Sequence, residues 1–319
     1  MFLPLRPMGL LLGPLGSPFL PHLPNIDGVD TQRPIPLRAT PISGEELAAF
    51  TPFTQFARAA YCPSEYIKDW SCGGNHTEAC DAITDFEPVW TSGDGDEVQL
   101  QFVGYWPPEN SIVVAYEGTD PTKIYSMLTD LDFVRRPLNR TLFPGIPANV
   151  LVHRGFADQH EMTATIVLSE VKKLLSSKNA QKVILVGHSL GGALSELAAL
   201  YMTLNLPSNV HVKGVTYGTP RVGNSEFAKF FNSKVHDFYR INNERDLIPL
   251  VPFIEMGYRH PHGEIHIISP NNAVACPWNW NDAFSPLCTS GAVPDIFEGD
   301  ILDHLGPYQG IEIGTIFCD

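Results

Sequence analysis

The stretch KVILVGHSLGGALSELAAL, residues 182–200, decides how the rest of the chain is organised. It begins with an apolar, partly β-branched run at residues 183–186, which is typical of a buried parallel strand. Residues 193–200 are rich in alanine and leucine and favour a helix. Between them, residues 187–191 read GHSLG, a G-x-S-x-G pattern on a tight strand-to-helix turn. We expect strained backbone at Ser189, with room only for glycine two residues before and after it.

This turn predicts that Ser189 is a nucleophile, with its Oγ at the carboxyl end of the sheet and at the positive end of a helix. A serine hydroxyl needs a base, usually histidine, whose tautomer is fixed by a buried acid. In this sheet type the three residues follow the order serine, acid, histidine. Asp246 lies just past a predicted strand and His304 lies in a loop near the C-terminus. We therefore predict Ser189, Asp246 and His304 as the catalytic triad.

Other acidic residues fit the acid position less well. Asp237 precedes its strand, so it points to the wrong end of the sheet. Asp295, Asp300 and Asp303 are loop residues that no strand places. Among the histidines, His153 comes before the serine and is expected to pack beneath the site.

A second histidine pattern leaves an alternative open. The run His-Pro-His-Gly-Glu-Ile-His, residues 260–266, could place His260, His262 and His266 beside Glu264 as metal ligands. Any half-exposed strand shows the same alternation, and no second cluster supplies further ligands. We therefore predict no metal and no organic cofactor.

Attack on an ester carbonyl creates an oxyanion, which needs two backbone N–H donors. Leu190 follows the nucleophile at the start of its helix and is predicted to supply one. Thr119 follows Gly118 at the end of a predicted strand, residues 112–116, and is predicted to supply the other. The same segment can be read as a turn with a helix cap, and the two roles are compatible.

Length and charge limit the function classes. The chain has 319 residues with 44% hydrophobic residues, enough for a sizeable core, and a formal net charge of −14. Such a charge argues against nucleic acid as a partner, because phosphates would be repelled. No stretch of about 20 unbroken apolar residues occurs, so we expect no membrane span. The six cysteines and two sequons, at Asn75 and Asn139, favour a secreted, extracellular protein.

Residues 1–40 are rich in X-Pro pairs and are predicted to be an N-terminal extension, followed by a single domain at residues 41–319. Strands and helices alternate through this domain, which predicts an α/β fold with a mostly parallel central sheet flanked by helices. The expected strands are 98–105, 112–116, 212–217, 238–242 and 264–268, besides 183–186. The expected helices are 43–58 with a break at Pro52, 162–176 and 227–231, besides 193–200.

These motifs together resemble the fungal class 3 lipases. The resemblance is carried by residues 187–193 (GHSLGGA), 218–224 (GTPRVGN), 243–249 (NERDLIP) and 303–304 (DH), and it extends from Tyr61-Cys62 to Cys318. It implies an α/β-hydrolase fold and hydrolysis of long-chain carboxylic esters. It assigns Ser189, Asp246 and His304 to the triad and Thr119 and Leu190 to the oxyanion hole. One departure is Glu117, where the family often has arginine.

The resemblance also implies a mobile helical lid at about residues 121–130. Ile124, Met127 and Leu128 would cover the acyl groove in water and rest on lipid when the lid opens. An ordinary surface helix would show the same apolar face. By analogy we expect disulfides Cys62–Cys318 and Cys72–Cys80, which leaves Cys276–Cys288 as a third pair.

We therefore expect a secreted serine hydrolase, in first place a triacylglycerol lipase that acts as a monomer on long-chain acyl esters at a lipid–water interface. A feruloyl-type esterase or a phospholipase A1 on the same fold are alternatives within the hydrolases. An inactive lipid-binding protein is the alternative outside them, although every triad position is filled.

Overall fold

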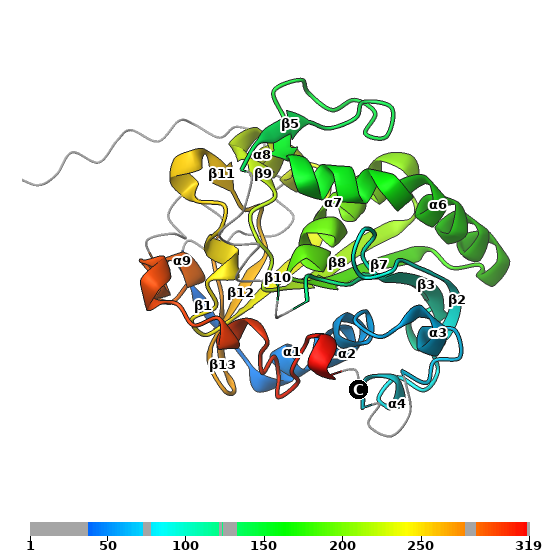
Figure 1. The fold of residues 1–319 in the computed structure, drawn as a ribbon, viewed down its shortest axis with the longest axis horizontal. Coiled ribbons are helices and arrows are strands. Elements are labelled where there is room, and N and C mark those ends of the chain that lie inside the picture. The colour runs from blue at the N-terminus through cyan, green and yellow to red at the C-terminus, as the bar shows by residue number, and fades with distance from the viewer. Residues whose placement is uncertain (1–37, 73–77, 121–122, 124–132, 278–284, 318–319) are drawn as a thin grey trace, which may run out of the picture. The chain divides into compact units, whose positions relative to one another are not determined.

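A computed structural model describes residues 38–72, 78–120, 123, 133–277 and 285–317 (Figure 1). The strands of the larger sheet are β1 (Thr40–Ile42), β2 (Glu87–Ser92), β3 (Gln101–Trp106), β4 (Ser111–Tyr116), β7 (Lys182–His188), β8 (His211–Tyr217), β10 (Asp237–Asn243), β12 (Glu264–Ser269) and β13 (Asn272–Ala275). A smaller sheet contains β5 (Arg135–Pro137), β6 (Leu151–His153), β9 (Gly223–Asn224) and β11 (Tyr258–Arg259). The α-helices are α1 (Gly44–Ala48), α2 (Thr51–Ala59), α3 (Ser64–Ile67), α4 (Glu78–Asp81), α6 (Arg154–Lys178), α7 (Leu190–Asn205), α8 (Ser225–Asn232) and α9 (Thr289–Ala292).

The larger sheet is mostly parallel in its centre. Its strand order is β1-β13-β12-β10-β8-β7-β4-β3-β2, and β4, β7, β8, β10 and β12 run parallel to one another. The strands at its two edges pair antiparallel. This confirms the predicted α/β fold, and it brings the carboxyl ends of β7 and β10 to the same edge of the sheet.

Helices cover both faces of this sheet, and strand β4 shows why. Ile112 and Val114 pack into a core shared with α6, α7 and α8. Val113 and Ala115 alternate with them and pack into a second core shared with α2. Successive side chains of a strand point to opposite faces, so a continuous apolar run supplies both cores. In Figure 1, α6 and α7 lie on one side of the sheet and α1 and α2 on the other.

The predicted helix at residues 43–58 is two helices, as the proline indicated. Ser43 caps α1 in a capping box with Glu46, and Pro52 lies in the first turn of α2. The helix predicted at 162–176 is longer, because α6 begins at Arg154. His153 caps this helix: its Nδ1 accepts the Phe156 N–H at 3.3 Å. The early turns of α6 carry a weak apolar pattern, so periodicity alone places the start of the helix too late.

Three strands of the larger sheet and all four strands of the smaller sheet escaped the sequence analysis. In the larger sheet, the missed strands β1 and β13 have only three and four residues. Strands β1 and β2 form the edges of this sheet. Glu87 and Val89 of β2 are exposed, and Pro88 is tolerated at an edge because it cannot donate to a neighbouring strand. Edge strands bury only part of their side chains, so their apolar pattern is weak.

Two of the three expected disulfides are present among the described residues. Cys72 is bonded to Cys80, and Cys276 is bonded to Cys288. The second pair joins the end of the β12–β13 hairpin to the start of α9. Both pairs fit an oxidising compartment.

Some predicted features lie outside the described residues. Cys62 is disulfide-bonded, but Cys318, its expected partner, is not among the residues described. The sequon at Asn75 and residues 1–37 of the predicted extension are likewise outside them. Asn139 is described, and it is exposed at the start of a turn.

Candidate active site

The turn between β7 and α7 has the strained backbone predicted from its sequence. Ser189 has φ 57° and ψ −128°, a region that non-glycine residues rarely adopt. A Cβ added at Gly187 would lie 2.1 Å from the carbonyl oxygen of Gly191, and one at Gly191 would lie 2.1 Å from that of Tyr116. Both positions therefore require glycine, and the turn holds Ser189 at the carboxyl end of the parallel strands.

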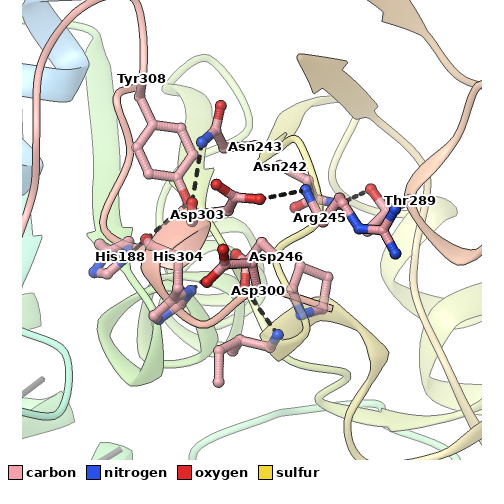
Figure 2. Close-up of polar contacts among 12 residues, drawn as sticks. His188, Asn242, Asn243, Arg245, Asp246, Thr289, Asp300, Asp303, His304 and Tyr308 are labelled. Atoms are coloured by element: carbon pink, nitrogen blue, oxygen red, sulfur yellow. Dashed lines mark hydrogen bonds and ion pairs between the residues drawn. The ribbon is translucent and has the colours of Figure 1, made fainter. Parts of the chain in front are cut away.

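Asp246 and His304 meet at the same edge of the sheet. The His304 Nδ1 lies 2.8 Å from Oδ2 of Asp246, and both side chains are fully buried (Figure 2). The other carboxylate oxygen, Oδ1, accepts the Ile248 N–H at 2.8 Å. Gly218 leaves the space for this pair, because a Cβ there would lie 2.7 Å from both side chains. Asp246 reaches this place from the turn that follows β10.

Two of the rival aspartates, Asp300 and Asp303, help to hold the loop that carries His304. Asp303 accepts the Arg245 N–H at 3.0 Å through Oδ2, and its carbonyl accepts the Asn243 amide at 3.1 Å (Figure 2). Asp300 donates its N–H to the Arg245 carbonyl at 2.9 Å. These bonds fasten residues 300–304 to the turn before Asp246. Sequence patterns could not predict these bonds, since the partners lie far apart along the chain.

Ser189 directly follows His188, and His188 contacts His304. The ring of His188 packs on the ring of His304 with centroids 4.3 Å apart. Among the described residues, Ser189 Oγ and His304 Nε2 have no hydrogen-bond partner, although both side chains are fully buried. Catalytic hydrogen bonds often tighten only once substrate is bound, so the two unpaired atoms are consistent with a nucleophile and its base.

The segment predicted to supply one oxyanion donor comes close to Ser189. A Cβ added at Gly118 would lie 2.8 Å from the Ser189 Cβ, so the residue before Thr119 passes directly beside the serine. Leu190 is the first residue of α7, where backbone N–H groups have no partner within the helix. Thr119 is half-buried.

The predicted lid residues Ile124, Met127 and Leu128 lie outside the described residues. Of residues 121–130, only Lys123 is described. It is exposed, and its Nζ forms an ion pair with Asp96 at 3.1 Å.

The histidine run at residues 260–266 is used for backbone hydrogen bonds. His260 bonds the Pro249 carbonyl at 2.9 Å and His262 the Val235 carbonyl at 2.9 Å. His266 bonds two carbonyls, through one ring nitrogen each. Ring nitrogens that bond to backbone carbonyls in this way are not arranged to bind one metal ion. These contacts therefore favour a structural role for the three histidines.

Comparison with known proteins identifies the family. A family model described as lipase (class 3) matches residues 113–256. The secreted mono- and diacylglycerol lipase LIP1 of Malassezia globosa is 30% identical over 290 residues, which cover 91% of this chain and 87% of that protein. The chain belongs to the class 3 lipase family. The secreted mono- and diacylglycerol lipase LIP2 of Malassezia restricta is 31% identical over 74% of this chain and 73% of its own.

Solved structures agree with this family and with the α/β-hydrolase fold. Lipase II from Rhizopus niveus has a TM-score of 0.74 and 26% identity, over 88% of this class 3 lipase and 100% of its own chain. A triacylglycerol lipase whose catalytic centre is a serine protease triad has a TM-score of 0.72 and 26% identity, with the same coverage. Among the described residues no helix has the length and apolar character needed to cross a bilayer. The protein is a secreted serine ester hydrolase.

In this class 3 lipase, Glu117 lies directly before Gly118, in the segment predicted to supply an oxyanion donor. Its side chain is buried, and Oε2 accepts the Leu100 N–H at 3.0 Å. Burial raises the pKa of the Glu117 carboxyl to about 7, against the opposing hydrogen bond from Leu100. Asp120 raises this pKa further and Lys123 lowers it. The position before Gly118 is therefore occupied by an acid whose pKa is raised to about 7.

We expect Glu117→Gln to flatten the pH dependence of stability. The native carboxyl keeps its proton up to a pKa of about 7, whereas the unfolded chain releases it near 4.5. The contribution of this carboxyl to the free energy of unfolding is therefore fully present below pH 4.5. It falls as the pH rises towards 7, by at most about 3 kcal/mol. Glutamine keeps an oxygen for the Leu100 N–H but cannot ionise. Urea unfolding at pH 5 and pH 8 measures the difference.

Glu97→Gln is the matched control, because this exposed glutamate lies on the neighbouring loop. We expect Glu97→Gln to keep the wild-type decline in unfolding free energy between pH 5 and pH 8. An equal decline in Glu117→Gln and in the wild type would contradict the role given to Glu117.

Proposed function

We propose that the protein hydrolyses long-chain acylglycerols through an acyl-enzyme formed on Ser189. The observation that carries this proposal is the buried His304–Asp246 pair at 2.8 Å, beside a serine on a strained turn. Membership of the class 3 lipase family supports acylglycerols as substrates, as do the names of the relatives. We further propose that it acts as a monomer at a lipid–water interface.

In the acylation step, His304 Nε2 takes the proton of Ser189 as Oγ attacks the ester carbonyl. Nδ1 of His304 stays hydrogen-bonded to Asp246, which stabilises the imidazolium that forms. The carbonyl oxygen becomes an oxyanion next to the N–H groups of Thr119 and Leu190. The positive end of helix α7 stabilises the same charge. His304 then donates its proton to the leaving alcohol.

In the deacylation step, water replaces the alcohol. His304 removes a proton from this water, which attacks the acyl carbonyl, and the same donors stabilise the second oxyanion. Collapse of the intermediate returns the proton to Ser189 and releases the fatty acid. The cycle uses protein groups alone, so we propose no metal and no organic cofactor.

We infer that residues 121–130 form a lid over this site and that residues 41–319 form the catalytic domain. Full burial of Ser189 supports the lid, because an ester cannot reach a buried hydroxyl without a conformational opening. Lys123, the lid residue whose place is described, is tied to Asp96 by an ion pair exposed to solvent.

A series of p-nitrophenyl esters of increasing chain length tests the substrate class. We expect kcat/KM to rise from acetate to long-chain esters and the rate to rise again when the substrate forms an emulsion. Mono-, di- and trioleoylglycerol assayed side by side then decide between the acylglycerols. Activity on feruloyl esters far above that on long-chain esters would favour the feruloyl-type esterase, and a preference for phospholipids would favour the phospholipase A1.

An organophosphonate separates the hydrolase from the inactive lipid-binding alternative. Only a serine activated by a base reacts with this probe. We expect stoichiometric labelling of Ser189, found by peptide mass spectrometry. Lipid binding without labelling would support the alternative.

A further inference from the structure

Two buried side chains that the proposed mechanism does not use lie against the site. Tyr61 follows helix α2, and its hydroxyl lies 2.6 Å from Nδ1 of His188. His188 directly precedes Ser189, and its Nε2 lies 2.7 Å from the carbonyl oxygen of His304 (Figure 2). Tyr61 and His188 are both almost completely buried. A chain of two hydrogen bonds therefore runs from Tyr61 to the loop that carries the proposed base.

The direction of these bonds follows from the carbonyl at one end. A carbonyl oxygen can only accept, so His188 Nε2 carries the proton and donates it. Neutral imidazole then has a bare Nδ1, which accepts the Tyr61 O–H. Burial, and next the charge of His304, hold the pKa of His188 well below its usual range, so the ring stays neutral. The His304 carbonyl thus fixes the tautomer of His188, and the Tyr61 hydroxyl satisfies the remaining ring nitrogen.

Tyr61 also touches the oxyanion loop. A Cβ at Gly118 would lie 2.3 Å from the Tyr61 hydroxyl, so this backbone packs directly on the oxygen. Burial raises the pKa of Tyr61, and a hydrogen bond from the Gly118 backbone acts against this rise. One hydroxyl is therefore in contact with the loop of Thr119 and with the residue before Ser189.

We propose that Tyr61 and His188 are positioning residues that form one connector between the oxyanion loop, the nucleophile turn and the loop of His304. This inference rests on the proposed function, because the proposed function gives these three segments their roles. The connector keeps them at fixed distances while charge develops on the oxyanion and on His304. It also keeps His188 neutral, so no second cation forms against the imidazolium, whose ring packs 4.3 Å away.

Without the Tyr61 hydroxyl, Nε2 of His188 still donates to the His304 carbonyl, but the buried Nδ1 loses its donor. The His188 ring and the loop of His304 are then no longer tied to the oxyanion loop. The Tyr308 hydroxyl also donates to the His304 carbonyl, at 3.2 Å. This bond does not involve Tyr61, so it cannot replace the link between the His304 loop and the oxyanion loop. The expected consequence is a displaced base and a displaced oxyanion loop in a protein that still folds.

The test compares Tyr61→Phe with Tyr217→Phe. Tyr217 is also fully buried, and its hydroxyl bonds Thr54 at 2.9 Å and the Phe50 carbonyl at 3.2 Å. We expect Tyr61→Phe to lower kcat on a p-nitrophenyl ester by about 10- to 100-fold with KM little changed. Tyr217→Phe should lose a similar unfolding free energy and keep kcat within about twofold. Equal kcat in the two variants would overturn the connector.

Substitution of His188 adds a conservative rescue and a spectroscopic signature. His188→Gln places an amide N–H near the position of Nε2, so we expect it to retain more kcat than His188→Phe at matched stability. In ¹⁵N NMR the wild-type His188 should be protonated at Nε2, and Tyr61→Phe should shift the Nδ1 signal. An unshifted signal would contradict the hydrogen bond from Tyr61 to Nδ1 of His188.

The two proposals can be rejected separately. A wild type without ester turnover or organophosphonate labelling would reject the proposed function, whereas a fully active Tyr61→Phe variant would reject the connector alone.

Discussion

Ser189→Ala is expected to lower kcat by about 10⁵- to 10⁶-fold, because without its Oγ no acyl-enzyme can form. The residual rate would come from the oxyanion donors and from substrate binding. Alanine keeps the same backbone and its left-handed φ of 57°, so the strain of the turn remains and the fold should be unaffected. Rates on a p-nitrophenyl ester and thermal unfolding measure the two effects separately.

Ser195→Ala is the matched control on the same helix. Ser195 is fully buried like Ser189, and its Oγ likewise has no hydrogen-bond partner among the described residues. The chemical change is the same, and we expect activity within about threefold of the wild type. If Ser189→Ala kept more than about 1% of the activity, Ser189 would not be the nucleophile.

Asp246→Asn is expected to lower kcat by about 10⁴-fold, the effect of a wrong histidine tautomer in the serine-protease template. The Ile248 N–H at 2.8 Å would hold the amide oxygen of the asparagine, which leaves its NH₂ group facing His304 Nδ1. A donor in that place forces Nδ1 to accept and puts the proton on Nε2. The ring could then no longer take the proton of Ser189. Rate measurements across the pH range test this result.

Asp303→Asn separates Asp246 from its nearest rival. Asp303 directly precedes His304, yet its carboxylate accepts the Arg245 N–H and not the imidazole. Asparagine can keep that bond, so we expect a loss of no more than about tenfold. A loss as large as that of Asp246→Asn would move the role of the acid to Asp303.

Local sequence was enough for the nucleophile turn. The apolar run, the glycines at 187 and 191 and the helix-forming residues after them act over a few residues, so each can be recognised without tertiary contacts. The break at Pro52 and the cap at Ser43 are local in the same sense. Edge strands such as β1 and β2 were missed, because half-exposed strands lack a strong apolar pattern.

The choice among the aspartates shows how much of the site can be predicted from the order of strands and candidate residues along the chain. The position of Asp246 after a strand predicted its side of the sheet, and the structure pairs it with His304 across a separation of 58 residues. The bonds that hold Asp300, Asp303 and Arg245 together had no signal in the sequence. They depend on how two loops pack, which periodicity does not report.

The sequence by itself determined the α/β fold, the position of Ser189 on a strained turn and the order of the three proposed triad residues. Only the tertiary structure decided which atoms meet. It joins Tyr61 to His188 across 127 residues, buries Glu117 against Leu100 and packs Gly118 beside Ser189. The physical reason is that strand and turn preferences are set by neighbouring residues, whereas hydrogen-bond partners and buried charges are set by segments that only folding brings together.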